Sequence, residues 1–94
     1  MSAAMLIDSH VNLHHHSYDA DREDVIRRAR EAGVARMITI CDKIENFDRV
    51  ITIAEAHAEI YASVGAHPHY AKDHLDLTAE RLIELGRHER VVGV

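Results

Sequence analysis

The chain has 94 residues, and its 11 Lys and Arg against 16 Asp and Glu give a formal net charge of −5. This length suffices for one small domain but not for a complete (β/α)8 barrel, which takes roughly 200 residues or more. The acidic balance argues against a generic nucleic-acid-binding surface, because phosphate groups favour a clustered basic face.

Signals for compartment and targeting are sparse. The single Cys41 cannot form an intrachain disulfide, which indicates a reducing compartment, and we expect a cytoplasmic protein. Residues 1–4 lack the charged start of a signal peptide. No apolar run approaches the roughly 18 residues that span a bilayer, so no membrane association is expected.

The apolar runs predict the order β-α-β-α-β-α-β, with about one βα unit between successive strands. Four strands are expected, each a nearly continuous apolar run of the kind found where both sheet faces are covered: 5–11, 36–41, 60–64 and 91–94. Three helices are expected, each after a residue whose side chain can cap its N-terminus: Asp21, Asn46 and Thr78. Gly33 is a natural stop for the first helix.

Apolar residues recur at helical spacing, and their faces should form the core. The expected core-facing residues are Val25, Ile26, Ala29 and Ala32, then Phe47, Val50, Ile51 and Ala54, then Leu82, Ile83 and Leu85. Right-handed crossovers place the strands side by side in chain order, which predicts an α/β fold with a parallel sheet, the first half of a (β/α)8 TIM-type barrel. An open doubly wound sheet is the alternative, but it usually carries a glycine-rich turn after the first strand, and no glycine precedes Gly33.

Histidines gather at one end of this expected sheet. Seven of the nine lie at or after the carboxyl end of the first or the third strand: His10, His14, His15, His16, His67, His69 and His74. Parallel α/β enzymes place their active sites at the carboxyl ends of their strands, so this end should carry the function.

The first cluster pairs His10 with Asn12. Residues i and i+2 of a strand share a face, so both side chains could bind one metal ion from a rigid strand. Asn12 is the poorer zinc ligand, and the alternative is that it only hydrogen-bonds the following loop. Asp8, on the same expected face, is the candidate catalytic carboxylate that orients a metal-bound histidine or contacts the metal; the alternative is a buried carboxylate paired with a later strand.

The second cluster is the turn that presents His67 and His69 on either side of Pro68, after Gly65. Glycine permits a close backbone approach and proline stiffens the turn, so both imidazoles could contact an anionic substrate. The alternative is a turn with solvated or packed histidines.

Two further features favour plain structural interpretations. The run His14–His16 is short and internal, which favours a solvated loop, although His14 could swing towards the site. Cys41, without an assigned base, favours packing over nucleophilic chemistry.

Three segments resemble the amino-terminal part of the TatD-related metal-dependent hydrolases: 5–10, 28–34 and 64–69, the last containing the Gly-x-His-Pro-His run. The resemblance implies a (β/α)8 barrel that uses one or two divalent ions, Mg, Mn or Zn, to hydrolyse DNA or another phosphodiester. It assigns His10 to the first metal ligand of a His-x-His motif, puts Asn12 where the second histidine is expected, and makes His67 and His69 substrate-facing.

The resemblance also implies that residues 1–94 form a single partial barrel domain, truncated at its carboxyl end before a bridging glutamate. The piece alone should then be weak or inactive and should self-associate through its exposed half-barrel edge. Two alternatives remain: an amidohydrolase-type enzyme for a small amide or ester, and a non-catalytic half-barrel module completed by a partner.

Overall fold

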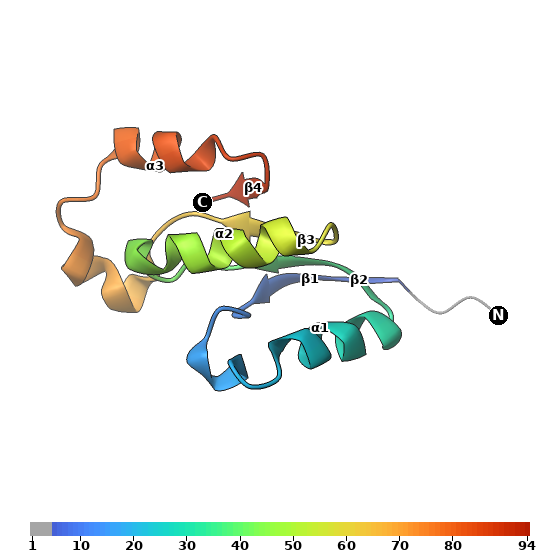
Figure 1. Cartoon of the computed structure of the whole chain (residues 1–94). Coiled ribbons are helices and arrows are strands. Elements are labelled where there is room, and N and C mark those ends of the chain that lie inside the picture. The colour runs from blue at the N-terminus through green and yellow to red at the C-terminus, as the bar shows by residue number, and fades with distance from the viewer. Residues whose placement is uncertain (1–4) are drawn as a thin grey trace.

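The computed structural model describes residues 5–94, so the expectation for residues 1–4 lies outside it. Its sheet has four parallel strands in the order β1-β2-β3-β4, which confirms the predicted topology (Figure 1). The strands are β1 (Leu6–Val11), β2 (Val34–Thr39), β3 (Ile60–Ser63) and β4 (Val91–Gly93).

Three α-helices connect the strands, and short 3-10 segments lie at one end of the sheet. The helices are α1 (Arg22–Glu31), α2 (Phe47–Ala56) and α3 (Ala79–Gly86); the 3-10 segments are η1 (His16–Tyr18), η2 (Ile44–Asn46) and η3 (Pro68–His74). In Figure 1 the 3-10 segments lie beyond the strand arrowheads, at the carboxyl ends of the strands. The loops expected to carry the chemistry therefore meet at this end.

The core lies between the helices and one face of the sheet. From the strands it takes Met37, Ile60 and Ala62; from the helices it takes Ile26, Phe47, Val50, Ile51 and Ala54. Leu82 and Leu85 of α3 pack against it, but the expectation for Ile83 is wrong, because that side chain is 59% exposed. One residue along a helix turns the side chain by about 100°, which takes Ile83 off the face shared by Leu82 and Leu85.

The helix ends follow the expected positions more closely than the expected chemistry. Thr78 caps α3, because its side chain accepts the backbone N–H of Arg81 at 3.1 Å. Asp21 and Asn46 precede α1 and α2 without a side-chain cap bond. After α1 the chain turns through Gly33, whose positive φ of 103° favours glycine.

The second strand begins and ends two residues earlier than predicted. It begins at Val34 because that residue pairs with Leu6 of β1. It ends at Thr39. The N–H of Ile40 still donates to the Val11 carbonyl of β1 at 2.9 Å, but the N–H of Cys41 donates to the side-chain oxygen of Ser63 at 3.1 Å.

The expectation that both sheet faces are covered is wrong. Nearly all of β1 is exposed, Ile7 by 69%, and Val92 of β4 is exposed by 54%. The helices cover one face, and no other element within residues 5–94 covers the opposite one. A closed barrel packs side chains against that face, so the exposed apolar residues are those expected of a half barrel. No helix in the described part of the chain is long and apolar enough to cross a membrane.

Candidate active site

A hollow of about 450 Å³ lies at the carboxyl end of the sheet, between the loops that follow β1, β2 and β3. Its lining residues are His10, Asn12, His14, His15, Ser17, Tyr18, Asp42, His67, His69 and Tyr70. The structure thus brings together four of the five predicted site residues, from two separate segments, and leaves out Asp8.

Asp8 lies in β1 just before a change of register: Asp8 pairs with Met37 and Val11 pairs with Thr39, so three residues along β1 match two along β2. Asp8 does not line the hollow, but it lines a neighbouring cavity against α1 together with His10 and Asn12. It is exposed, and its Oδ1 accepts the backbone N–H of His10 at 3.1 Å.

The His67 turn has a defined hydrogen-bonding geometry. Its Nδ1 accepts the backbone N–H of His69 at 3.1 Å, and the two rings meet edge to face with centroids 4.7 Å apart. A neutral imidazole that accepts on Nδ1 carries its proton on Nε2. His67 therefore offers an N–H donor, which suits an anionic oxygen.

Two further residues line the hollow: His14, for which the sequence left a position at the site open, and Asp42, which the sequence did not single out. His15 and His16 are exposed, as predicted for a solvated loop, but His14 is only 3% exposed. Its Nε2 lies 2.9 Å from Oδ1 of Asp42. The position of Asp42 just after β2 was the available signal, because the carboxyl ends of parallel strands share one edge.

The carboxylate of Asp42 is held by several donors. Its Oδ1 also accepts the backbone N–H of Lys43 at 2.8 Å and the side-chain amide of Asn46 at 3.1 Å. Partial burial works to raise the pKa of Asp42, but the bond from Asn46, the neighbouring His14 and the Lys43 N–H outweigh it. The pKa of Asp42 therefore lies below its ordinary value, and the group is a carboxylate at neutral pH.

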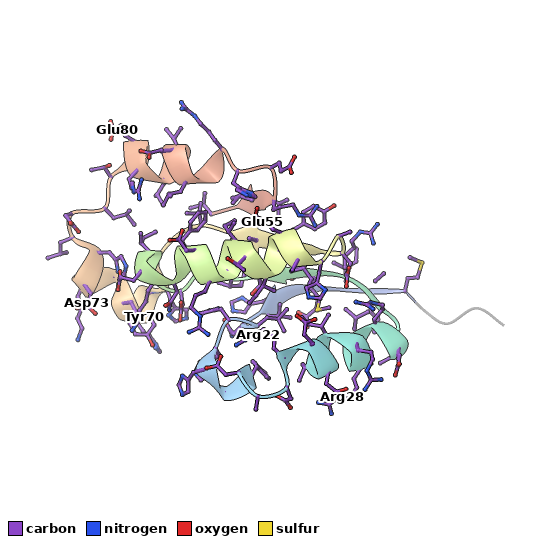
Figure 2. The ribbon with its side chains drawn as sticks, viewed as in Figure 1. Arg22, Arg28, Glu55, Tyr70, Asp73 and Glu80 are labelled. Carbon is purple, nitrogen blue, oxygen red and sulfur yellow. The ribbon has the colours of Figure 1, made fainter. Side chains whose placement is uncertain are left out.

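The η3 segment supplies the outer wall and is anchored by His74. Tyr70 borders the hollow, with the Lys43 ammonium 4.3 Å from its ring centre; Figure 2 marks this tyrosine on η3. Nδ1 of His74 lies 2.8 Å from the Tyr70 carbonyl, and Nε2 lies 3.1 Å from Glu45 Oε1. The hydrogen bond to that carbonyl, and then the Glu45 charge, outweigh desolvation and raise the pKa of His74.

Cys41 behaves as a packing residue, as predicted. It is 3% exposed, and its Sγ donates to the Lys43 carbonyl at 3.1 Å. Burial raises the pKa of its thiol, so the thiolate that nucleophilic chemistry needs is disfavoured.

The side chains present do not complete a metal site. Among residues 5–94, no three His, Cys, Asp or Glu side chains are placed to hold one ion together. His10 with the amide of Asn12 gives at most two ligands, and zinc sites use at least three protein ligands.

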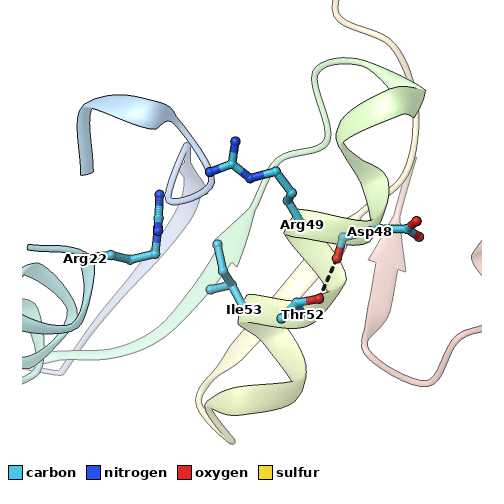
Figure 3. A pocket seen from close by; sticks show the side chains of 5 residues that line it. All are labelled: Arg22, Asp48, Arg49, Thr52 and Ile53. Carbon is cyan, nitrogen blue, oxygen red and sulfur yellow. Dashed lines mark hydrogen bonds between the residues drawn. The ribbon is translucent and has the colours of Figure 1, made fainter. Parts of the chain in front are cut away.

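A second hollow, of about 270 Å³, lies between the beginnings of α1 and α2. Figure 3 shows Arg22 and Arg49 approaching one another there. Both donate to Oδ1 of Asp19, at 2.8 and 3.0 Å, so a carboxylate already neutralises part of their charge.

The geometry can be set beside known proteins. A family model described as TatD related DNase matches residues 7–94. The chain belongs to the TatD family. The family resemblance of the three sequence segments is thereby confirmed.

Individual TatD relatives agree with this assignment. The chain is 37% identical to the uncharacterized metal-dependent hydrolase YabD of Bacillus subtilis, covering 96% of this chain and 35% of the relative. It is 34% identical to the 3'-5' ssDNA/RNA exonuclease TatD of Cronobacter turicensis, covering 95% of this chain and 34% of that relative. The crystal structure of YjjV, a TatD homolog from Escherichia coli K12, superposes with a TM-score of 0.81 at 34% identity, covering 93% of this chain and 34% of that one.

The chain therefore spans about a third of the length of the relatives it matches. The four parallel strands and their helices correspond to part of a TIM-type barrel, which confirms the predicted fold class.

Proposed function

We propose that this chain supplies the amino-terminal part of a divalent-metal-dependent hydrolase that cleaves phosphodiester bonds, with DNA as its main substrate class. One observation carries the proposal: His10, Asn12, His67 and His69 come from two distant segments and line the same hollow at the carboxyl end of the sheet. Curated relatives of the chain are named as metal-dependent hydrolases and as ssDNA/RNA exonucleases.

The chain's own residues divide the work between two loops. His10 and Asn12 face the metal-binding side, and Asp8 steadies His10 through the backbone bond of 3.1 Å. His67 and His69 face the substrate, where the Nε2–H of His67 donates to a phosphate oxygen. A bound divalent ion would supply an activated water and neutralise phosphate charge. Residues 5–94 hold no group of three ligand side chains. We therefore place the remaining ligands of the ion in other parts of the whole protein.

Two consequences concern the 94-residue chain by itself. With at most two ligands, His10 on β1 and Asn12 just after it, we expect weak or no hydrolysis. With β1 and β4 exposing apolar side chains, we expect self-association through the open half-barrel face. The test of this second point is sedimentation velocity: a clean monomer at micromolar concentration would contradict it.

The function is tested with the whole protein and a labelled single-stranded oligodeoxynucleotide, in Mg²⁺, Mn²⁺, Zn²⁺ or EDTA. We expect cleavage that needs a divalent ion and falls sharply in His10→Ala. A His16→Ala variant is the matched control, because His16 is exposed and does not line the hollow. No cleavage with any of these ions would overturn the proposal, and turnover of a small ester or amide would favour the alternative enzyme class.

A further inference from the structure

We propose that Asp42 is the positioning residue of this site: its carboxylate fixes the His14 ring, its backbone carbonyl fixes the His67 turn, and one residue thereby sets the spacing of the two histidine-bearing loops. This inference deepens the function proposed above and rests on it for the meaning of the site.

The sheet order puts Asp42 where both loops can be reached. It follows β2, which lies between β1 and β3. On the β1 side, Oδ1 of Asp42 lies 2.9 Å from Nε2 of His14. On the β3 side, the backbone N–H of His67 donates to the Asp42 carbonyl at 2.8 Å. Within residues 5–94, no other residue that lines the hollow is hydrogen-bonded to both loops.

Asp42 is itself held from the α2 side. The backbone N–H of Lys43 and the side-chain amide of Asn46 both donate to Oδ1, at 2.8 and 3.1 Å. The Asn46 side chain is thus directed to Asp42 and makes no cap bond at the start of α2. Because Lys43 and Asn46 hold the Asp42 side chain in place, Asp42 can in turn fix the positions of the two neighbouring loops.

The carboxylate also selects the tautomer of His14. An ionised carboxylate only accepts hydrogen bonds, so a neutral His14 must carry its proton on Nε2. Nδ1 is then left with a lone pair, buried and without a hydrogen-bond partner in the described part of the chain. Native proteins seldom leave a buried polar atom unpaired without a reason, and a fixed ring at an active site is one such reason.

The first test reads the tautomer directly. The whole protein is labelled with ¹⁵N at histidine, and two-bond ¹H–¹⁵N correlations separate the Nε2–H from the Nδ1–H form. We expect His14 in the Nε2–H form in the natural protein and in Asp48→Asn, and loss of that preference in Asp42→Asn. Asp48 is the matched control, because it is exposed at the start of α2 and does not line the hollow.

Either of two results overturns the proposal: an Nδ1–H tautomer in the natural protein, or an unchanged tautomer in Asp42→Asn. Circular dichroism checks that Asp42→Asn folds. If it does not fold, the spectrum of the natural protein still decides, because that measurement needs no variant.

The second test uses cleavage of the oligonucleotide by the whole protein. Misplaced reacting groups cost rate, so we expect Asp42→Asn to lower kcat by about tenfold or more relative to Asp48→Asn, with a smaller change in KM. Equal kcat in the two variants overturns the positioning role. Failure of the natural protein to cleave at all overturns the proposed function instead, and the tautomer result then stands separately.

Discussion

Replacing His67 by asparagine or glutamine distinguishes the two nitrogens of its ring. Nδ1 already accepts the His69 N–H, so Nε2–H is the donor left for substrate. Glutamine can place an amide N–H near the position of Nε2, whereas asparagine reaches only the position of Nδ1. We therefore expect His67→Asn to lose the substrate contact and His67→Gln to keep part of it.

The size of the effect follows from the charge of the acceptor. A hydrogen bond to a charged group contributes about 1.5–3 kcal/mol net. Each 1.36 kcal/mol of transition-state stabilisation is a factor of ten, so kcat/KM of His67→Asn should fall by about 10- to 150-fold. His67→Gln should lie between this variant and the natural protein.

The assay is divalent-dependent cleavage of a single-stranded oligonucleotide by the whole protein, with His16→Asn as control. If His67→Asn cleaves as fast as His16→Asn, His67 does not contact the substrate. If His67→Gln falls as far as His67→Asn, the contact does not run through Nε2–H and the tautomer argument is wrong.

Three further predictions concern stability, each measured by urea unfolding. Ile60→Ala should lower the free energy of unfolding by about 2–5 kcal/mol, because Ile60 is fully buried and its removal leaves a cavity. Arg90→Ala should lower the free energy of unfolding by about 2 kcal/mol, because Arg90 donates to three backbone carbonyls and its guanidinium carbon lies 4.1 Å from the Tyr61 ring centre. The exposed Arg87→Ala is the control and should change it little; equal effects would contradict the reasoning. His74 has a raised folded pKa, so its contribution is complete below about pH 6.5 and is lost as pH rises through the folded pKa. His74→Gln should lack that loss, and the same pH dependence in both proteins would refute it.

The sequence predicted the sheet well because hydrophobic burial sets it. The runs around Ile60 and Val91 recur one βα unit apart, and right-handed crossovers leave one strand order for such a series. The limits of β2 were missed by two residues, since its start follows the pairing of Val34 with Leu6 and the N–H of Cys41 beyond its end donates to the Ser63 side chain, and no periodicity encodes either contact.

Part of the candidate site was predictable because the order of the strands was predictable. His10 and His67 follow apolar runs, and the shared carboxyl edge of parallel strands brings them together. Asp8 shares a neighbouring cavity with His10 and Asn12 but does not line the hollow itself, and that distinction depends on loop positions that composition does not encode. The sequence left His14 between a solvated loop and the site, because its partner, Asp42, lies 28 positions away in the chain.

Each strand pairs only with its neighbours in the chain, and this has a consequence for synthesis. Contacts between chain neighbours close short loops, which form quickly, and domains are released from the ribosome amino terminus first. The hollow draws its walls from the loops after β1, β2 and β3 and takes nothing from α3 or β4. The histidine-rich half of the site can therefore be assembled while the ribosome is still adding the fourth strand.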